Sequence, residues 1–151
     1  MSPYSGPKKE ITMNQLNPYL LFNGDAAKAI ELYEKTLGAK TEGLMRYGDG
    51  PGGGEISKKD TDLVMHAMLR IGGGVVMVGD SMPMQPVAFG DNVQVVLDFE
   101  DKAEMIEKFN ALAKTGKITM PLADMFWGAQ FGSLVDAHGV NWMFNCMLKK
   151  D

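Results

Sequence analysis

The chain repeats its own order of elements, and this internal repeat constrains the fold more than any other feature of the sequence. An aspartate that precedes an amphipathic stretch occurs at Asp25 and again 76 residues later at Asp101. A glycine turn that precedes an apolar run occurs at Gly73 and again 66 residues later at Gly139. Because both halves carry the same signals in the same order, we expect two tandem βαβββ modules, residues 14–82 and 91–148, in an α+β fold.

Hydrophobic periodicity and turn residues predict the elements of each module. Asp25 and Asp101 are the expected N-caps of the two helices, and Glu104 is placed to complete a capping box. Gly38 and Gly116 are expected to end these helices. The predicted elements are helices over 26–37 and 102–113, and strands over 17–22, 40–47, 62–71, 75–78, 93–99, around 118, 131–135 and 140–147.

Three segments lie outside these elements. Residues 1–13 are rich in Pro, Ser, Gly and Lys and are expected to form a disordered leader before a single domain over 14–151. Residues 48–59 contain so much glycine that they predict a mobile loop. Residues 79–91, which contain two prolines, are the predicted linker between the modules.

Composition excludes several classes of function. The net charge of −4 provides no basic surface, so nucleic acid is not an expected partner. The single cysteine, Cys146, excludes an intrachain disulfide and a cysteine-built zinc site, and a cytoplasmic location is expected. No apolar run reaches the roughly 18 residues that a membrane span needs. The thirteen methionines indicate adaptable core packing or, alternatively, an adaptable pocket wall.

Residues 121–145 contain both tryptophans and gather aromatic rings beside glycines. Phe126 and Trp127 precede one glycine, and Trp142 lies in the last apolar run. Rings beside glycines indicate either an aromatic plug over the core or a wall that a ligand approaches closely. In the repeat, Phe126 and Trp127 correspond to the glycine loop 48–59. This correspondence favours the interpretation as a pocket wall, but it does not exclude the aromatic plug.

Short motifs spread over residues 14–147 carry a family resemblance. They are Asn17-Pro18-Tyr19-Leu20, Phe22-Asn23-Gly24, Leu37-Gly38-Ala39, His66-Ala67 with Leu69-Arg70-Ile71, Asp80-Ser81-Met82-Pro83, Phe126-Trp127-Gly128, and Gly139-Val140 with Trp142-Met143. With these motifs the chain resembles the vicinal oxygen chelate proteins, the glyoxalase and bleomycin-resistance superfamily, and within it the PhnB-like (YjdN-like) branch. The resemblance implies two βαβββ modules whose mixed sheets curl into a cup, commonly in a homodimer.

The resemblance also implies where a metal would bind. Glyoxalase-type relatives hold a divalent ion with His, Glu or Gln residues on the first and last strands of each module. Alignment through the repeat places Pro18 and Gln94 at the first-strand positions, and Met77 and Met143 at the last-strand positions. Proline and thioethers do not suit hard divalent ions, so only Gln94 remains, and we expect neither a metal nor another cofactor.

An alignment slip of one or two residues would instead bring Asp80 or Asp98 near the metal positions. Without such a slip, Asp80 is typical turn chemistry before Pro83 or a polar anchor on the cup rim.

Two histidines are present. His66 lies on one predicted strand face with Met68 and Arg70, so it is either a hydrogen-bonded structural residue or part of a site for a polarised ligand. It is also a candidate catalytic base. His138 precedes a turn glycine and is expected to be exposed.

Methyltransferase labels have often been attached to this branch, and the sequence does not support them. The glycine clusters do not open helices, and the chain lacks the alternating β-α pattern of a methyltransferase sheet. No nucleophilic triad is evident either.

Two functions therefore remain open. The favoured one is a metal-free small-molecule binding protein with an apolar, aromatic cup. The alternative is a divalent-metal-dependent lyase, isomerase or dioxygenase of the same superfamily, and a third option is a metal-free enzyme that uses His66 as a general base. The predicted ligand-binding residues are His66, Met77, Gln94, Phe126, Trp127, Asn141 and Met143.

Overall fold

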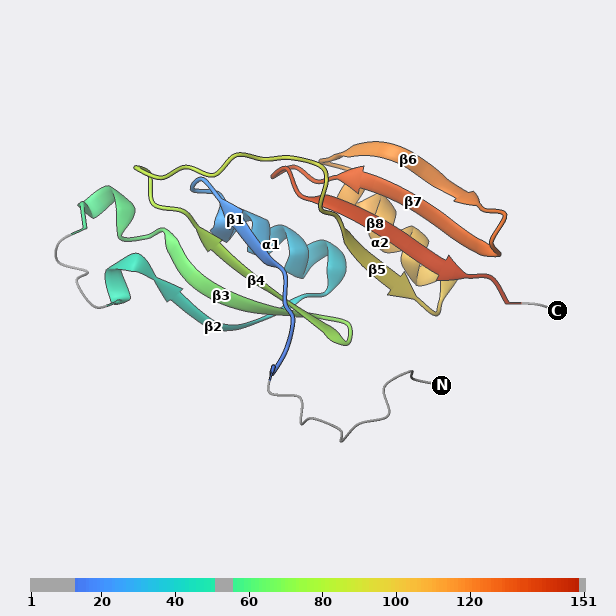
Figure 1. Cartoon of the computed structure of the whole chain (residues 1–151), viewed down its shortest axis with the longest axis horizontal. Coiled ribbons are helices and arrows are strands. Elements are labelled where there is room, and N and C mark those ends of the chain that lie inside the picture. Colours follow the sequence, from blue (N-terminus) through green and yellow to red (C-terminus); the bar gives the residue numbers. More distant parts are fainter. Residues whose placement is uncertain (1–12, 51–55, 150–151) are drawn as a thin grey trace, which may run out of the picture.

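The computed structural model describes residues 13–50 and 56–149, and it contains the two predicted βαβββ modules (Figure 1). Module one consists of β1 (Tyr19–Phe22), α1 (Ala26–Leu37), β2 (Lys40–Arg46), β3 (Val64–Ile71) and β4 (Gly74–Asp80). Module two consists of β5 (Val95–Phe99), α2 (Lys102–Ala113), β6 (Lys117–Asp124), β7 (Ala129–Val135) and β8 (Asn141–Met147). The predicted leader, apart from Met13, and residues 51–55 of the predicted glycine loop lie outside the described residues.

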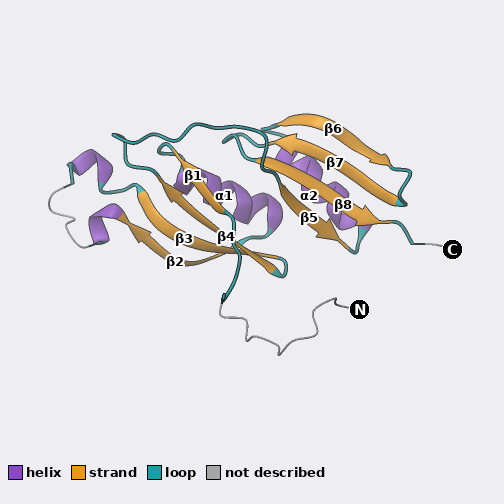
Figure 2. Ribbon diagram, in the orientation of Figure 1, coloured by secondary structure: helices purple, strands orange, loops and turns teal. Residues whose placement is uncertain are grey.

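Each module forms its own four-stranded mixed sheet. The strand orders are β1-β4-β3-β2 and β5-β8-β7-β6, with β1 parallel to β4 and β5 parallel to β8. The predicted α+β fold is therefore confirmed, and the two sheets remain separate with β1 and β5 as edge strands. Both helices cover the same side of the sheets, as Figure 2 shows.

The sheet side that carries no helix in Figure 2 is called the open face below. Alternation along the strands assigns side chains to this face, because the intervening residues are buried under the helices. In the first sheet they include Tyr19, Leu21, His66, Met68 and Met77, and in the second Val96, Asp98, Phe131, Met143 and Asn145.

The helix starts differ from the sequence prediction in one respect. Asp101 caps α2 as expected, since its carboxylate accepts from the backbone N–H groups of Ala103 and Glu104. Asp25 makes no side-chain cap bond, so its predicted role is wrong. Asp80, at the end of β4, takes that role instead.

Asp80 is 2% exposed and accepts three backbone hydrogen bonds. Its Oδ1 accepts from Gly24 N at 2.9 Å and from Ala26 N at 3.0 Å, at the start of α1. Its Oδ2 accepts from Val64 N at 3.0 Å, at the start of β3. One buried carboxylate thus joins the first helix turn to two strands.

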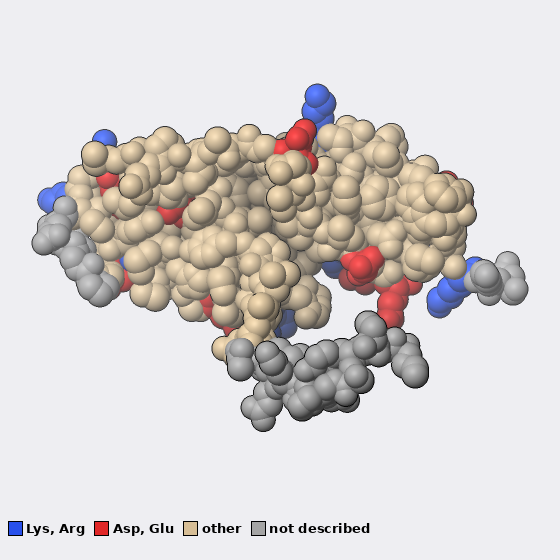
Figure 3. All heavy atoms as spheres, in the orientation of Figure 1, with Lys and Arg blue, Asp and Glu red and all other residues tan. Residues whose placement is uncertain are grey.

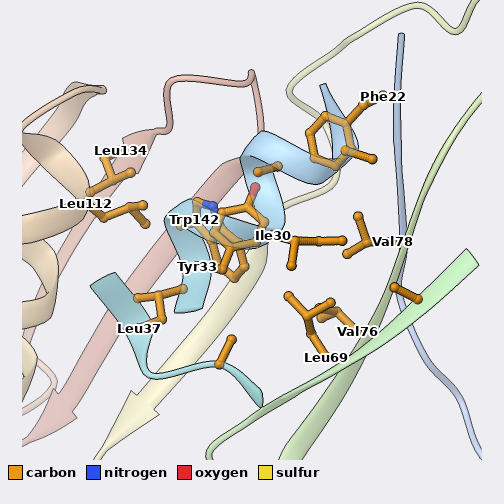
Figure 4. Close-up of a cluster of buried hydrophobic side chains, with 14 of the residues drawn as sticks. Phe22, Ile30, Tyr33, Leu37, Leu69, Val76, Val78, Leu112, Leu134 and Trp142 are labelled. Atoms are coloured by element: carbon orange, nitrogen blue, oxygen red, sulfur yellow. The ribbon is translucent and has the colours of Figure 1, made fainter. Parts of the chain in front are cut away.

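The core crosses the boundary between the modules. Tyr33 of α1 and Trp142 of β8 are fully buried and meet edge to face, with ring centroids 5.3 Å apart (Figure 4). Figure 4 also shows Leu112 and Leu134 of module two near this ring pair. The two modules therefore share one hydrophobic cluster.

A buried aspartate lies beside this ring pair. Asp136 is 5% exposed, and its Oδ2 accepts from the Tyr33 hydroxyl at 2.5 Å and from Trp142 Nε1 at 2.8 Å. Its Oδ1 accepts from the backbone N–H groups of His138 and Val140. Burial, together with the charge of Asp136 and the hydrogen bond to it, raises the pKa of Tyr33 far above its usual value, which keeps the hydroxyl protonated as a donor.

The linker after β4 is held by one asparagine from each module. Asn23 donates to the carbonyl oxygen of Val87 and accepts from its N–H, and Asn141 donates to the carbonyl oxygen of Gly90. Phe89 packs over Gly139, where an added Cβ would lie 2.5 Å from its ring. The segment between β4 and β5 runs over residues 81–94, whereas the linker was predicted over 79–91, and the first two predicted residues belong to β4.

His138 is not the exposed residue that its turn position suggested. Its side chain is 15% exposed, meets the ring of Phe22 edge to face, and has Nδ1 3.7 Å from Asp25 Oδ2. The turn that contains His138 packs against module one, and the local sequence does not predict this tertiary contact.

No helix in the described part of the chain is long and apolar enough to cross a membrane.

Candidate functional site

The open face of module one carries a tyrosine–histidine pair. The Tyr19 hydroxyl lies 3.2 Å from His66 Nδ1 and 3.2 Å from the carbonyl oxygen of Met65, to which it donates. The two rings are 5.7 Å apart between centroids. Register places Tyr19 beside Met77 and Met77 beside Met68, so thioether side chains neighbour the pair.

A glycine makes room for this arrangement. A Cβ added at Gly79 would lie 3.0 Å from the Tyr19 hydroxyl oxygen and 2.8 Å from the Met65 carbonyl oxygen. Because a larger residue would clash with both oxygens, only glycine lets Tyr19 lie across β4 and reach His66.

The Tyr19 hydroxyl stays protonated near neutral pH. Partial burial is the larger cause that raises the pKa of Tyr19, and the neighbouring Tyr47 is the smaller one.

The open face of module two carries a second polar pair. Asn145 Nδ2 donates to Asp98 Oδ1 at 2.9 Å, from β8 to β5. Val96 and Met143 are register neighbours on the same two strands. Figure 3, drawn in the orientation of Figure 1, shows that uncharged residues form most of the visible surface.

The observed register differs from the alignment that placed the first-strand positions expected for a superfamily metal site. Tyr19, and not Pro18, lies beside Met77, and Val96, and not Gln94, lies beside Met143. These four side chains offer a phenol, a valine and two thioethers, which do not suit a hard divalent ion.

No other cluster of ligands takes the place of those positions. Within residues 13–50 and 56–149, no group of three or more His, Cys, Asp or Glu side chains could hold a metal ion. Asp98, which an alignment slip would have brought near the metal positions, does lie on the open face, where Asn145 donates to it. Asp80 is buried among backbone N–H groups. The described residues therefore do not fit the superfamily metal site.

The structure separates the predicted ligand-binding residues into groups. His66 and Met77 both neighbour Tyr19 on the first sheet, and Met143 lies on the open face of the second. Gln94 and Asn141 lie near the linker instead. Gln94 donates to the carbonyl oxygen of Asp91 at 3.2 Å, and the Asn141 amide is bound to Gly90.

Phe126 and Trp127 lie in the turn between β6 and β7, as the repeat predicted. Phe126 is 97% exposed and meets Trp127 edge to face at 5.1 Å. Trp127 is 46% exposed and in turn meets Phe131 at 5.9 Å. These contacts extend the open face of module two at one end, and the rings do not plug the core.

A groove of about 860 Å³ lies between the modules and shares Val96 and Asp98 with the open face. Its walls include the residues before β1, the turn between β3 and β4, strand β5 and the start of α2, and Val76 and Trp142 also line it. One side of the groove is acidic, with Asp98, Glu100, Asp101 and Glu104. None of the seven predicted ligand-binding residues lines this groove.

Tyr19 is the site residue that sequence reasoning missed. The available signal was strand alternation, which puts Tyr19 and Leu21 on one face of β1 and Leu20 and Phe22 on the other. The register between β1 and β4 was still needed to place Tyr19 beside His66.

Comparisons with known proteins agree with this architecture. Residues 15–144 match the family model described as the Glyoxalase/Bleomycin resistance protein/Dioxygenase superfamily. The chain is 33% identical to Protein YjdN of Escherichia coli K12 over 138 residues, which are 86% of this chain and 93% of that protein. The structure is similar to protein PA1353 from Pseudomonas aeruginosa, with a TM-score of 0.81 and 37% identity, covering 91% of this chain and 100% of that one.

A third similar structure carries a functional label. It is a Bacillus cereus PhnB protein described as a putative 3-demethylubiquinone-9 3-methyltransferase, with a TM-score of 0.72 and 25% identity, covering 88% of this chain and 99% of that one. Its similarity adds to the evidence for the branch. Two βαβββ modules, the family match over most of the chain and these relatives lead to one conclusion: the chain belongs to the glyoxalase/bleomycin resistance protein/dioxygenase superfamily, in its PhnB/YjdN-like branch.

Proposed function

We propose that the protein binds small, largely apolar molecules on its open face without a metal ion. The observation that carries the proposal is the composition of that face. Methionine, leucine, valine and phenylalanine side chains surround two polar pairs, Tyr19–His66 and Asp98–Asn145. Ligand sites are typically apolar surfaces with a few placed polar groups, and methionines adapt to ligands of different shape.

A thermal-shift titration with 2-naphthol and 2-methoxynaphthalene tests this proposal. At about ten times the dissociation constant, a bound ligand should raise the unfolding midpoint by roughly 3–6 °C. Met77→Glu puts a charge on the open face and should abolish the rise, because a carboxylate beside an apolar ligand loses hydration. Met84→Glu is the matched control, because Met84 is 93% exposed in the linker. Equal shifts in both variants would show that the ligand binds elsewhere.

The alternative function, a metal-dependent lyase, isomerase or dioxygenase, is tested by elemental analysis. Protein loaded in turn with Ni, Mn, Fe and Zn should retain no stoichiometric metal, because the four aligned strand positions offer no hard ligand set. Tight one-to-one binding accompanied by activity on hemithioacetals or catechols would replace the binding function by the enzymatic one.

We further propose that the protein acts as a homodimer, with the edge strands β1 and β5 forming the contact between copies. Exposed apolar side chains at Leu21, Val96 and Met147, each more than 40% exposed, support this proposal. Unpaired edges at β1 and β5 add to it, since exposed edges favour pairing with another chain. Light scattering at micromolar concentration should give twice the monomer mass of 16.5 kDa, and a monomer would contradict the proposal.

A further inference from the structure

We infer that Tyr19 fixes the tautomer of His66 so that Nε2 is a hydrogen-bond acceptor on the open face, selective for ligands with a weakly acidic O–H group such as phenols. This inference rests on the proposed binding function and names the ligand class that module one would take. Tyr19 is a positioning residue in this arrangement, and His66 is the residue that contacts the ligand.

The geometry supports a directional chain of hydrogen bonds. The Tyr19 hydroxyl has one proton, and it donates that proton to the Met65 carbonyl oxygen at 3.2 Å. The hydroxyl oxygen can then only accept from His66 Nδ1, which is also 3.2 Å away. Both contacts are satisfied together when Nδ1 carries the imidazole proton, and hydrogen bonds in such a chain strengthen one another.

The other ring nitrogen is thereby left as an acceptor. In a neutral imidazole only one nitrogen carries a proton, so a protonated Nδ1 leaves a lone pair on Nε2. His66 is half-buried. Among the described residues, Gln130 Oε1 is the only buried side-chain nitrogen or oxygen without a hydrogen-bond partner, so His66 Nε2 is not a buried atom without a partner. The described residues give Nε2 no hydrogen-bond partner, so it reaches the surface of the open face.

The surroundings select the ligand class. Met45 and Met68 lie on the same face beside His66, opposite it on β2 and two positions along β3, and Leu21 is exposed two positions from Tyr19. The cation nearest in sequence on this face, Arg70, is paired with Glu42 at 2.9 Å. An apolar surface with one acceptor and a neutralised charge pair favours an aromatic body with a single O–H donor over an anion.

Nitrogen NMR of the histidine rings tests the tautomer directly. The sequence contains only His66 and His138, so a His138→Gln variant assigns both sets of signals. At pH 8, where an ordinary imidazole is neutral, we expect a protonated Nδ1 and an unprotonated Nε2 for His66. Tyr19→Phe should return the ring to a mixture of tautomers. Tyr47→Phe is the matched control, because its hydroxyl donates to the Asp80 carbonyl oxygen and not to His66. A protonated Nε2 in the unchanged protein overturns the inference.

Affinities for a matched pair of probes test the ligand class. 2-Naphthol should bind about tenfold more tightly than 2-methoxynaphthalene, which lacks the donor. His66→Phe should abolish this preference, and Tyr19→Phe should reduce it. Equal affinities for the two probes would overturn the inference and leave the binding function standing. Failure of both probes to bind would count against the proposed function, and the inference would fall with it.

Discussion

Asp136→Ala is expected to lower the free energy of unfolding by about 3–6 kcal/mol. The substitution leaves four donors without their acceptor: the Tyr33 hydroxyl, Trp142 Nε1–H and two backbone N–H groups. A buried donor without a partner costs about 1–3 kcal/mol, and water entering the space would recover part of the sum. Because a domain of this size has roughly 5–15 kcal/mol of stability, the loss would be a large share of the total.

Chemical denaturation followed by tryptophan fluorescence measures this effect. Asp136→Asn is the second variant, because its amide oxygen can still accept from the backbone while its NH2 group faces Trp142 Nε1–H; we expect a loss of about 2–4 kcal/mol. Asp124→Ala, at an exposed aspartate of the same module, should change stability by less than about 0.5 kcal/mol. An Asp136→Ala variant as stable as the Asp124→Ala control would refute the role assigned to Asp136.

Asp80→Ala is expected to cost about 3 kcal/mol, since it leaves the N–H groups of Gly24, Ala26 and Val64 without their acceptor. Asp25→Ala provides the contrast: Asp25 occupies the N-cap position but makes no cap bond, so its loss should cost less than about 1 kcal/mol. Denaturant midpoints of the two variants, measured side by side, decide the matter. A larger loss for Asp25→Ala would restore the cap predicted from sequence.

The elements that sequence patterns predicted best are those with local causes. The range of α1 was predicted to the residue, because the apolar stripe from Ala26 to Leu37 and the left-handed Gly38 after it are both encoded locally. The strands were placed within a few residues, except that β6 extends to Asp124 where only a short strand was expected. Its exposed, mostly unpatterned residues gave no periodic signal.

The candidate site was predicted less well, because it depends on register between strands far apart in the chain. The helices overlay with an offset of 76 residues, but the paired positions Tyr19 and Val96 are 77 apart. A register shift of one residue moves every side chain of a strand to the opposite face of the sheet. The helix offset alone therefore does not give the strand register, in which Tyr19 and Val96, and not Pro18 and Gln94, lie beside Met77 and Met143.

The two ways of capping the helices have a consequence for how the modules acquire their structure. Asp101 reaches the first turn of α2 across two and three residues, so that turn can close as soon as the local chain bends. The cap of α1 comes from Asp80, which is 54 residues from Ala26 in sequence. Asp80 reaches the start of α1 only when β4 is in place. Contacts at long sequence separation require chain entropy to be lost before they form. The first turn of α1 is therefore fully hydrogen-bonded only after the first sheet has formed, whereas the first turn of α2 is capped by its own neighbouring residue. The two modules have the same architecture but differ in how far each depends on distant parts of the chain.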